Sequence, residues 1–436
     1  MHKQKNIAIT LFISLYIIGF TQAQGLKLIS SFSGNLAPKS IVHNGNGLFF
    51  AQNMMYEHSI TVYNRQDGLV KTLNDSIKLS NYGFKRFKDT VLGAPCEAAI
   101  SHKGKYVWVA NYAMYGNGFD SNANDDCIPN GGYDSSYIFK ISTKDFKVKN
   151  AIQVGCVPKF LQVYKDSLLL VSNWCSGIIS VVSLASEKVI RSYNVKMYPR
   201  GIAFDPYSNT AFIAQMGTYE IAKINLSTHL FDSIVVPGRS PRHLCIDPIN
   251  RLLYATLNGS GLVAKIDLET DSTLKTVATG RAPRSMVLTA DGKYLYVVNY
   301  YSNTVSKVRT TDMKVLESIQ TEPKPIGITF DDKNKHVWVS CYEGFVQKFE
   351  DSFYGVDSLY EQTPNETFGL VLGSFASRLN AERLTETLQL KSITAVVVEV
   401  KSKYRVAYCA YATIEEALEA KSENDDLRNG WVLKCE

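Results

Sequence analysis

The feature that constrains the fold most is a proline that recurs through the chain, each time directly before a short apolar run. The seven copies are Pro38, Pro95, Pro158, Pro199, Pro241, Pro283 and Pro325. Successive prolines are 57, 63, 41, 42, 42 and 42 residues apart. A fixed period of this length is a signature of repeat proteins, in which each repeat is one structural unit. The period therefore indicates the fold class before any local pattern is considered.

Each repeat contains four short apolar runs. The clearest copy has MVLT at 286–289, YLYVVN at 294–299, NTVSKV at 303–308 and KVLESIQ at 314–320. Runs this short, rich in Val, Ile, Tyr and Leu and bounded by turn residues, predict β-strands. Four antiparallel strands per repeat form one propeller blade. A solenoid of helix pairs is disfavoured, because no run has the length or the 3.6-residue spacing of a packed helix.

The second runs of five repeats keep the same register. They begin at Leu168, Thr210, Leu252, Tyr294 and His336, each 42 residues after the last. The segments YVWVANY (106–112), YLYVVNY (294–300) and HVWVSCY (336–342) resemble the YVTN family of β-propeller repeats. This resemblance covers roughly residues 26–350, and it implies a mainly β chain with a seven-bladed propeller over residues 25–350. A propeller alone does not specify a function.

The seventh repeat has no convincing fourth run, and this predicts how the ring closes. The N-terminal run LKLISSF, Leu26–Phe32, is similar to the fourth runs VIRSYNV and VLESIQ. We therefore expect Leu26–Phe32 to pair beside Phe345–Glu350 and to remove the open edge of the ring. The alternative is a loose N-terminal arm.

Residues 1–23 have the pattern of a secretory signal peptide. Lys3 and Lys5 form a basic start, the stretch 7–20 is apolar, and 21–23 (TQA) offers a small-residue cleavage site. No later apolar run reaches the length of a membrane span. We therefore expect an exported, periplasmic or cell-envelope protein. The net charge of +6 is mild for 436 residues and, together with export, argues against nucleic acid as a partner.

After a polar linker at 351–365, the residue pattern changes. FGLVLGSF (368–375), AVVVEV (395–400), YRVAYCAY (404–411) and WVLKC (431–435) predict strands. Ser377 is placed to cap a helix whose apolar residues fall on one face, and 413–416 (TIEE) predicts a second helix. The order βαββαβ is that of a small α+β domain at 366–436.

This C-terminal segment resembles the SPOR domain, a peptidoglycan-binding module of bacterial envelope proteins. The resemblance rests on 373–375 (GSF) with 380–384 (NAERL), and on 404–406 (YRV) with 415–417 (EEA). It implies a glycan site on the open sheet face. By strand alternation Arg405 points to that face, with Phe368 or Val371 as an apolar platform. Val371, Ala407 and Cys409 replace residues frequent in the family, so an SPOR-like fold without glycan binding is the alternative.

Most of the repeat prolines precede a basic residue, and this predicts a ligand site on the propeller. A blade's first strand starts on the face where its second strand ends. We therefore expect basic residues and aromatic residues to surround one mouth of the central channel: Lys39, Lys159, Arg200, Arg242 and Arg284 with Tyr112, Trp174, Tyr300 and Tyr342. Such a set suits an anionic group, a glycan or a peptide. The alternative is local pairing and packing between blades.

Catalytic and metal signals are weak. His243 is the only histidine expected beside the channel, and no nucleophilic triad or paired carboxylates recur there. The insertion in blade 2, 113–136, holds an Asp/Asn-rich stretch at 120–126 that lacks the glycine and glutamate of a calcium loop. We therefore expect neither a cofactor nor a catalytic role.

Eight cysteines in an exported chain predict disulfides. Their positions within blades 2 and 3 predict the pairs Cys96–Cys127 and Cys156–Cys175. The sequence as a whole predicts an envelope binding protein, with peptidoglycan as one partner and a protein, anionic or glycan ligand on the propeller. The alternative is an envelope lyase or hydrolase whose active site lies at the channel mouth.

Overall fold

The computed structural model of the chain describes residues 25–54, 57–120, 126–127, 132–195, 198–357, 367–390, 395–400, 403–411 and 431–435. The signal-peptide stretch, most of the Asp/Asn-rich stretch at 120–126, and the second expected helix therefore lie outside the described residues. Two compact units form, one spanning Gly25–Tyr354 and the other within Gly355–Glu436. Each is described by itself.

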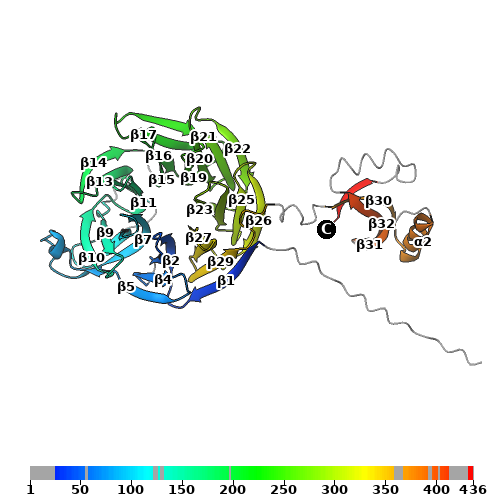
Figure 1. Cartoon of the computed structure of the whole chain (residues 1–436), viewed down its shortest axis with the longest axis horizontal. Helices are drawn as coiled ribbons and strands as arrows, with labels where there is room; N and C mark the ends of the chain where they lie inside the picture. Colours follow the sequence, from blue (N-terminus) through cyan, green and yellow to red (C-terminus); the bar gives the residue numbers. More distant parts are fainter. Residues whose placement is uncertain are drawn as a thin grey trace, which may run out of the picture. The chain divides into compact units, whose positions relative to one another are not determined.

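The first unit is a seven-bladed β-propeller, which confirms the predicted fold class (Figure 1). Blade 1 comprises β2 (Pro38–His43), β3 (Leu48–Asn53), β4 (Ser59–Asn64) and β5 (Leu69–Asn74). Blade 2 comprises β7 (Val91–Ser101), β8 (Tyr106–Tyr115), β9 (Tyr137–Ser142) and β10 (Val148–Gln153), with the short β6 (Ser76–Ile77) paired to β7. A 3-10 turn, η1 (Leu79–Tyr82), precedes β7.

Blades 3 to 5 follow the repeat closely. Blade 3 comprises β11 (Pro158–Tyr164), β12 (Leu168–Asn173), β13 (Ile178–Ser183) and β14 (Lys188–Asn194). Blade 4 comprises β15 (Pro199–Asp205), β16 (Thr210–Gln215), β17 (Glu220–Asn225) and β18 (Phe231–Val235). Blade 5 comprises β19 (Pro241–Asp247), β20 (Leu252–Leu257), β21 (Leu262–Asp267) and β22 (Thr273–Ala278).

The last two blades complete the ring. Blade 6 comprises β23 (Pro283–Leu288), β24 (Tyr294–Asn299), β25 (Thr304–Arg309) and β26 (Lys314–Gln320). Blade 7 comprises β27 (Pro325–Asp331), β28 (His336–Cys341), β29 (Phe345–Asp351) and the N-terminal β1 (Leu26–Ser33). The first strand of every blade lies innermost, and these seven strands surround the channel (Figure 1).

The N-terminal strand closes the ring as predicted. β1 runs antiparallel to β29, with Leu26 opposite Asp351 and Phe32 opposite Val346. The neighbouring blade also holds this strand, because the Leu26 amide donates a hydrogen bond to the Glu317 carboxylate at 2.9 Å. Leu26 itself is fully buried in the cluster between blades 6 and 7. The N-terminal segment is therefore part of the core and not a loose arm.

A recurring lysine joins neighbouring blades. In five blades a lysine on the third strand reaches the end of the third strand of the next blade or the turn that follows it, namely Lys140, Lys223, Lys265, Lys307 and Lys348. The partner is a carboxylate in four cases, such as Asp271 for Lys223. Lys265 instead donates to the Thr310 carbonyl at 2.9 Å. A long side chain can bury its stem against the sheet while its ammonium crosses the blade boundary.

The second unit contains one sheet of order β31-β32-β30-β33 and one described helix. The strands are β30 (Thr367–Phe375), β31 (Val396–Val400), β32 (Lys403–Tyr411) and β33 (Trp431–Cys435), and the helix is α2 (Arg378–Gln389). Ala381 and Leu388 of α2 are buried against Leu370 and Val406 of the sheet. This confirms the predicted helix face. Ser377 takes the N-cap position without a side-chain hydrogen bond.

Candidate functional site

The second residue of the innermost strand is basic in five blades. These residues are Lys39, Lys159, Arg200, Arg242 and Arg284, called the cationic ring below. The preceding proline pairs with the last residue of the second strand, as Pro158 does with Asn173 and Pro241 does with Leu257. Because this register repeats from blade to blade, the basic residues fall at one end of the channel.

The charges of the cationic ring lie close to one another. Burial and the charges of the four other members hold the pKa of Lys39 well below its usual value, which places these charges within interaction range of one ammonium. Lys159, Arg200 and Arg242 are 5%, 6% and 7% exposed. The Arg200 guanidinium also donates to the Lys159 carbonyl at 3.0 Å. The ring thus concentrates positive charge at the end of the channel, where water is largely excluded.

The four predicted aromatic residues contact these cations. The Lys159 ammonium lies 4.0 Å from the centroid of the Trp174 ring and 5.5 Å from that of Tyr112. The Arg284 guanidinium lies 3.6 Å from the Tyr300 ring centroid. Lys39 lies 5.7 Å from the Tyr342 ring centroid. The structure therefore brings together all nine predicted residues, and cation–π contacts of this kind stabilise buried positive charge.

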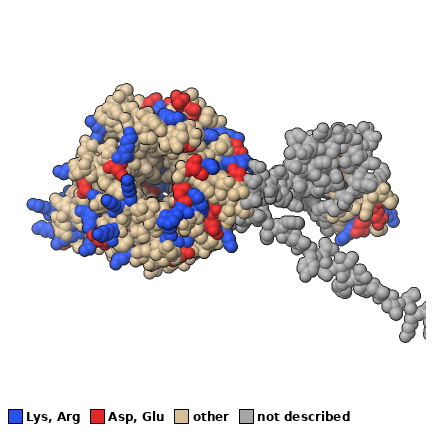
Figure 2. Space-filling view, in the orientation of Figure 1, with Lys and Arg blue, Asp and Glu red and all other residues tan. Residues whose placement is uncertain are grey.

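A cavity of about 770 Å³ occupies the channel. Its lining starts one or two residues after each member of the cationic ring and extends to Pro206 and Pro248 beyond the opposite ends of the strands. In the space-filling view the propeller is hollowed at its centre (Figure 2). The volume is within the usual range of small-molecule sites. The cationic ring therefore lies at one end of a cavity large enough for a ligand.

The lining residues nearest the ring form a polar layer, defined here as Ser40, Glu97, His243 and Ser285. Glu97 lies near Arg200 and Lys39, and its carboxyl group interacts with the Ser40 hydroxyl, which itself donates to the Gln52 side-chain oxygen. Burial raises the pKa of Glu97 to about 7, and the positive charges of Arg200 and Lys39 oppose this rise. The site thus contains one carboxyl group with a pKa close to neutrality.

Glu97 was not among the predicted site residues, although its position in the repeat carries a signal. Glu97 follows Cys96, which stands where five other repeats have a basic residue. A carboxylate one position after a ring position, on a strand that faces the same channel, could have been recognised as its counter-charge. The pKa of the neighbouring Cys96 thiol is raised to about 12, mainly by burial and then by Glu97.

His243 lies beside the ring as expected, and it is neutral. Burial, followed by the charges of Arg200 and Arg242, lowers its pKa to about 3. The Phe160 ring meets the imidazole edge to face at 5.2 Å between centroids. A neutral imidazole both donates and accepts hydrogen bonds. In the described part of the chain, no group of three or more His, Cys, Asp or Glu side chains is arranged to hold a metal ion.

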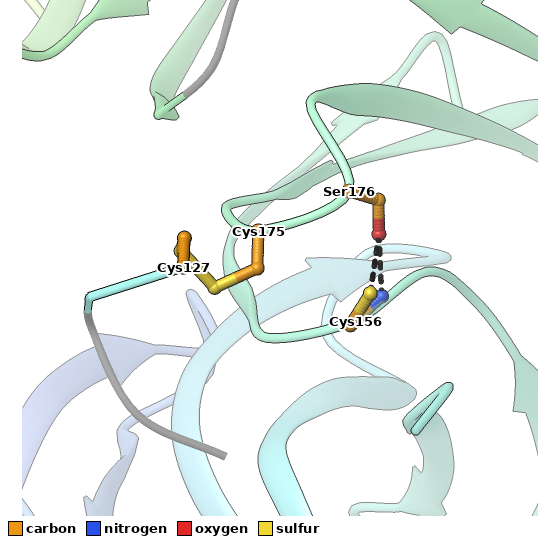
Figure 3. Close-up of a disulfide and its surroundings, with 4 residues drawn as sticks. All are labelled: Cys127, Cys156, Cys175 and Ser176. Carbon is orange, nitrogen blue, oxygen red and sulfur yellow. Dashed lines mark hydrogen bonds between the residues drawn. A yellow bond between two sulfur atoms is a disulfide. The ribbon is translucent and has the colours of Figure 1, made fainter. Parts of the chain in front are cut away.

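The predicted disulfide pairs are wrong. Cys127 bonds to Cys175, while Cys96 and Cys156 are free (Figure 3). The prediction assumed that each blade bonds its own loops. Instead, the insertion in blade 2 brings Cys127 to the loop between β12 and β13 of blade 3, beside Trp174. Cys156 instead contacts Ser176, with 3.0 Å between the thiol sulfur and the hydroxyl oxygen.

The C-terminal unit places Arg405 opposite its helix. Tyr404 and Val406 of β32 pack in the cluster around α2, so alternation directs the intervening Arg405 to the other face. Arg405 is half-buried, and its Nε atom is buried without a hydrogen-bond partner among the described residues.

The expected apolar platform needs a correction. Val371 is fully buried, because its strand β30 is central and Val371 lies between Ala407 and Trp431 on the flanking strands. It therefore offers no exposed surface to a glycan. The side chain of Phe368 lies outside the described residues.

Comparisons with known families identify the C-terminal unit. Residues 364–432 match the SPOR domain. Comparison with curated proteins finds no similar sequence. None of the helices in the described part of the chain has the length and apolar character needed to cross a membrane. Peptidoglycan binding is the function associated with the matched family. The chain thus combines a seven-bladed β-propeller with a C-terminal SPOR domain.

Proposed function

We propose that this is an exported, periplasmic or cell-envelope binding protein with two recognition sites. The SPOR domain binds glycan strands of peptidoglycan, and the propeller binds a ligand with an anionic group at the cationic ring. The signal-peptide pattern of residues 1–23 supports export. Binding rather than catalysis is the proposed role, without a cofactor.

One observation carries the propeller's part of this proposal. Five basic residues from five blades converge on one end of a cavity, and three of them are more than nine-tenths buried. Burying positive charge is costly unless an opposite charge or a hydrogen-bond acceptor is available. An incoming anion would add a further opposite charge to the partners that these cations already have, such as Glu97 near Arg200, and charge-assisted hydrogen bonds to guanidinium groups are among the strongest in proteins.

The propeller site is tested by calorimetric titration of the full chain with citrate, a compact polycarboxylate. We expect Arg242→Ala to weaken binding by about 1.5–3 kcal/mol, the usual loss for a charged hydrogen bond. Arg191→Ala is the matched control, because Arg191 is an exposed arginine on the outermost strand β14 of blade 3. Equal citrate binding by both variants would contradict the proposal.

The SPOR site is tested by sedimentation of the full chain with purified peptidoglycan sacculi. We expect Arg405→Ala to shift protein from the pellet to the supernatant, because Arg405 lies on the sheet face opposite α2. Arg378→Ala is the control, since Arg378 is an exposed residue of α2 that forms a surface ion pair with Glu382. Unchanged pelleting of Arg405→Ala would contradict a glycan site at this residue.

A catalytic role is the second candidate, and Glu97 favours it. A carboxyl group with a pKa near 7, beside Arg200 and in a cavity, has the properties of a general acid or base. Glu97→Gln would abolish such an activity and would not weaken citrate binding, because it removes a negative charge beside Arg200. Envelope polysaccharides incubated with the full chain, followed by product analysis, distinguish catalysis from binding.

A further inference from the structure

Arg200 is the cation that the surrounding groups share. Its charge acts on the pKa of Lys39, Glu97 and His243. Arg242 acts on two of these three groups, Lys39 and His243. An anionic group beside Arg200 and Arg242 would therefore be next to both the cationic ring and the polar layer. This position is where a ligand's charge is best compensated.

The next part of the cavity changes character, from charged to polar and neutral. His243 is uncharged, and Ser285 lines the cavity at the same level, whereas the buried Ser40 hydroxyl there donates to Gln52. One residue pair further along the strands, the lining includes Gln162 and Thr329. These groups both donate and accept hydrogen bonds. They suit the hydroxyl groups of a polyol and not a second strong charge.

The same region offers an aromatic surface. Phe160 lines the cavity from blade 3, directly after Lys159 of the cationic ring. Sugar rings combine hydroxyl edges with apolar C–H faces, and aromatic rings commonly pack against such faces. The cavity thus has positive charge at one end, neutral hydrogen-bonding groups beside it and an aromatic surface next to them. This arrangement matches the chemical groups of an acidic sugar.

Glu97 opposes a ligand with several charges. It is the one carboxyl group among the cavity-lining residues of the polar layer, and it lies near Arg200. A phosphate dianion at Arg200 would face this carboxyl group with two charges, whereas a carboxylate would face it with one. A sugar hydroxyl, in contrast, can donate a hydrogen bond to Glu97.

Building on the proposed function, we infer that the propeller ligand is a carboxylate-bearing sugar, bound end-on in the channel. Its carboxylate lies at Arg200 and Arg242, its hydroxyl groups contact His243 and Glu97, and its C–H face packs on Phe160. Two sources share this chemistry. One is the muramic acid of peptidoglycan, and the other is a uronic acid of a different envelope polysaccharide.

The test is calorimetric titration of the full chain with four probes: N-acetylmuramic acid, glucuronate, N-acetylglucosamine and inorganic phosphate. We expect at least one carboxylated sugar to bind at least about tenfold more tightly than N-acetylglucosamine, since only the carboxylate adds a charge-assisted acceptor beside Arg200 and Arg242. Preference for N-acetylmuramic acid identifies peptidoglycan as the source, and preference for glucuronate identifies a uronic acid polymer. Equal affinity for the neutral sugar would overturn the inference.

Two variants distinguish the residue that binds the anionic group from the residue that binds the sugar hydroxyl groups. Arg242→Gln should weaken the carboxylated sugar and phosphate alike, because both need the cation. His243→Phe, which keeps a ring of similar size, should weaken the sugar by about tenfold and leave phosphate unchanged, because only the sugar uses the imidazole. Circular dichroism and thermal melts confirm that each variant is folded.

The outcomes separate this inference from the proposed function. If phosphate binds as tightly as the carboxylated sugars and His243→Phe affects neither, the anion site stands and the sugar inference is wrong. If neither phosphate nor any sugar binds, and citrate does not bind either, both are wrong.

Discussion

Blade 6 and blade 2 show how one repeat serves different purposes at the same position. In blade 6, Lys307 is fully buried and pairs with the equally buried Asp351 at 2.7 Å. In blade 2 the corresponding residue is Lys140, whose partner Glu187 is partly exposed to solvent. Both blades have a lysine at this position, but of the two only blade 6 places the whole ion pair in the core.

The asparagine at the end of the second strand shows a second contrast. In blade 6 the side-chain oxygen of Asn299 accepts a hydrogen bond from the Thr279 hydroxyl at 2.8 Å. In blade 2 the side-chain oxygen of Asn111 has no such donor. The Asn111 oxygen and a carboxyl oxygen of the buried Asp75 both lie over Gly93. A methyl group added to Gly93 would be 2.2 Å from the first and 2.3 Å from the second, so the two oxygens are close to each other.

Both contrasts distinguish a blade that follows the repeat from a blade that departs from it. Blade 6 keeps the repeat, and its Asn299 and Lys307 side chains both have partners, Thr279 and Asp351. Blade 2 carries the inserted segment between β5 and β7, the insertion before β9, the extra strand β6 and the acidic residue Glu97. Among the described residues, burial raises the pKa of the carboxyl groups of Asp75 and Glu97 at these departures, and also that of Glu317 in blade 6, where β1 closes the ring.

The largest expected effect tests the buried ion pair. Lys307→Met leaves the Asp351 carboxylate buried without its cation, which typically costs about 3–5 kcal/mol of unfolding free energy. Lys140→Met is the matched change in blade 2, and we expect it to cost about 1 kcal/mol or less because water can solvate Glu187. Urea unfolding of both variants measures the difference. Equal losses would show that the two blades do not differ at this position.

Removing the disulfide is expected to have the next largest effect on stability. Cys127→Ser with Cys175→Ser should lower the unfolding free energy by about 2–4 kcal/mol, because the link closes a loop with a sequence separation of 48. Cys156→Ser, in which a free thiol is replaced, should change it by less than about 0.5 kcal/mol. A non-reduced digest examined by mass spectrometry gives the pairing directly. A peptide linking Cys156 to Cys175 would contradict this structure.

The smallest expected effect is that of replacing Asp75, and this change should increase the unfolding free energy instead of lowering it. Burial raises the pKa of Asp75 well above its usual value, so folding favours the protonated acid. Its contribution to stability is therefore complete below about pH 3.9, the unfolded value, and declines as the pH rises toward the folded value. Asp75→Asn cannot ionise, and its amide can donate to Asn111. We expect it to stabilise the protein by about 1–3 kcal/mol at pH 8.

The same prediction has a pH readout and a matched control. The stability difference between Asp75→Asn and the unaltered protein, measured in urea, should shrink as the pH is lowered from 8 to 4. In blade 6, Thr279→Val removes the donor to Asn299 and should destabilise by about 1–3 kcal/mol at every pH. A stability difference for Asp75→Asn that does not vary with pH would rule out the titration of this residue.

Much of the propeller could be predicted because its information is periodic. A proline before each innermost strand fixes the register, and the register alone brings Lys39 and Arg284 to the same end of the channel. The missing fourth run in repeat seven likewise predicted the pairing of Leu26–Phe32 with β29. Periodic patterns specify which face and which end a residue occupies, and these two facts determine the candidate site.

The misses share a different cause, since none of them is periodic. The pairing of Cys127 depends on where an insertion lies in space, and no spacing rule describes that. Glu97 departs from the repeat, so a search for recurring residues passes over it. Val371 lies on a strand flanked on both sides, and the order of strands in the small sheet decided its burial. Non-local packing, which the sequence pattern does not encode, determined each outcome.

The strand that closes the ring also sets the order in which the chain can fold. β1 is synthesised first, yet its partners are Glu317, at a sequence separation of 291, and β29. Contacts so distant along the chain form slowly, because the loop between them must close first. Until then, the edges of β1 and β29 expose unpaired backbone groups that can pair with other chains. The last step of folding is therefore also the step at which a nascent molecule is most exposed to aggregation, and a chaperone that shields β1 would act at this point.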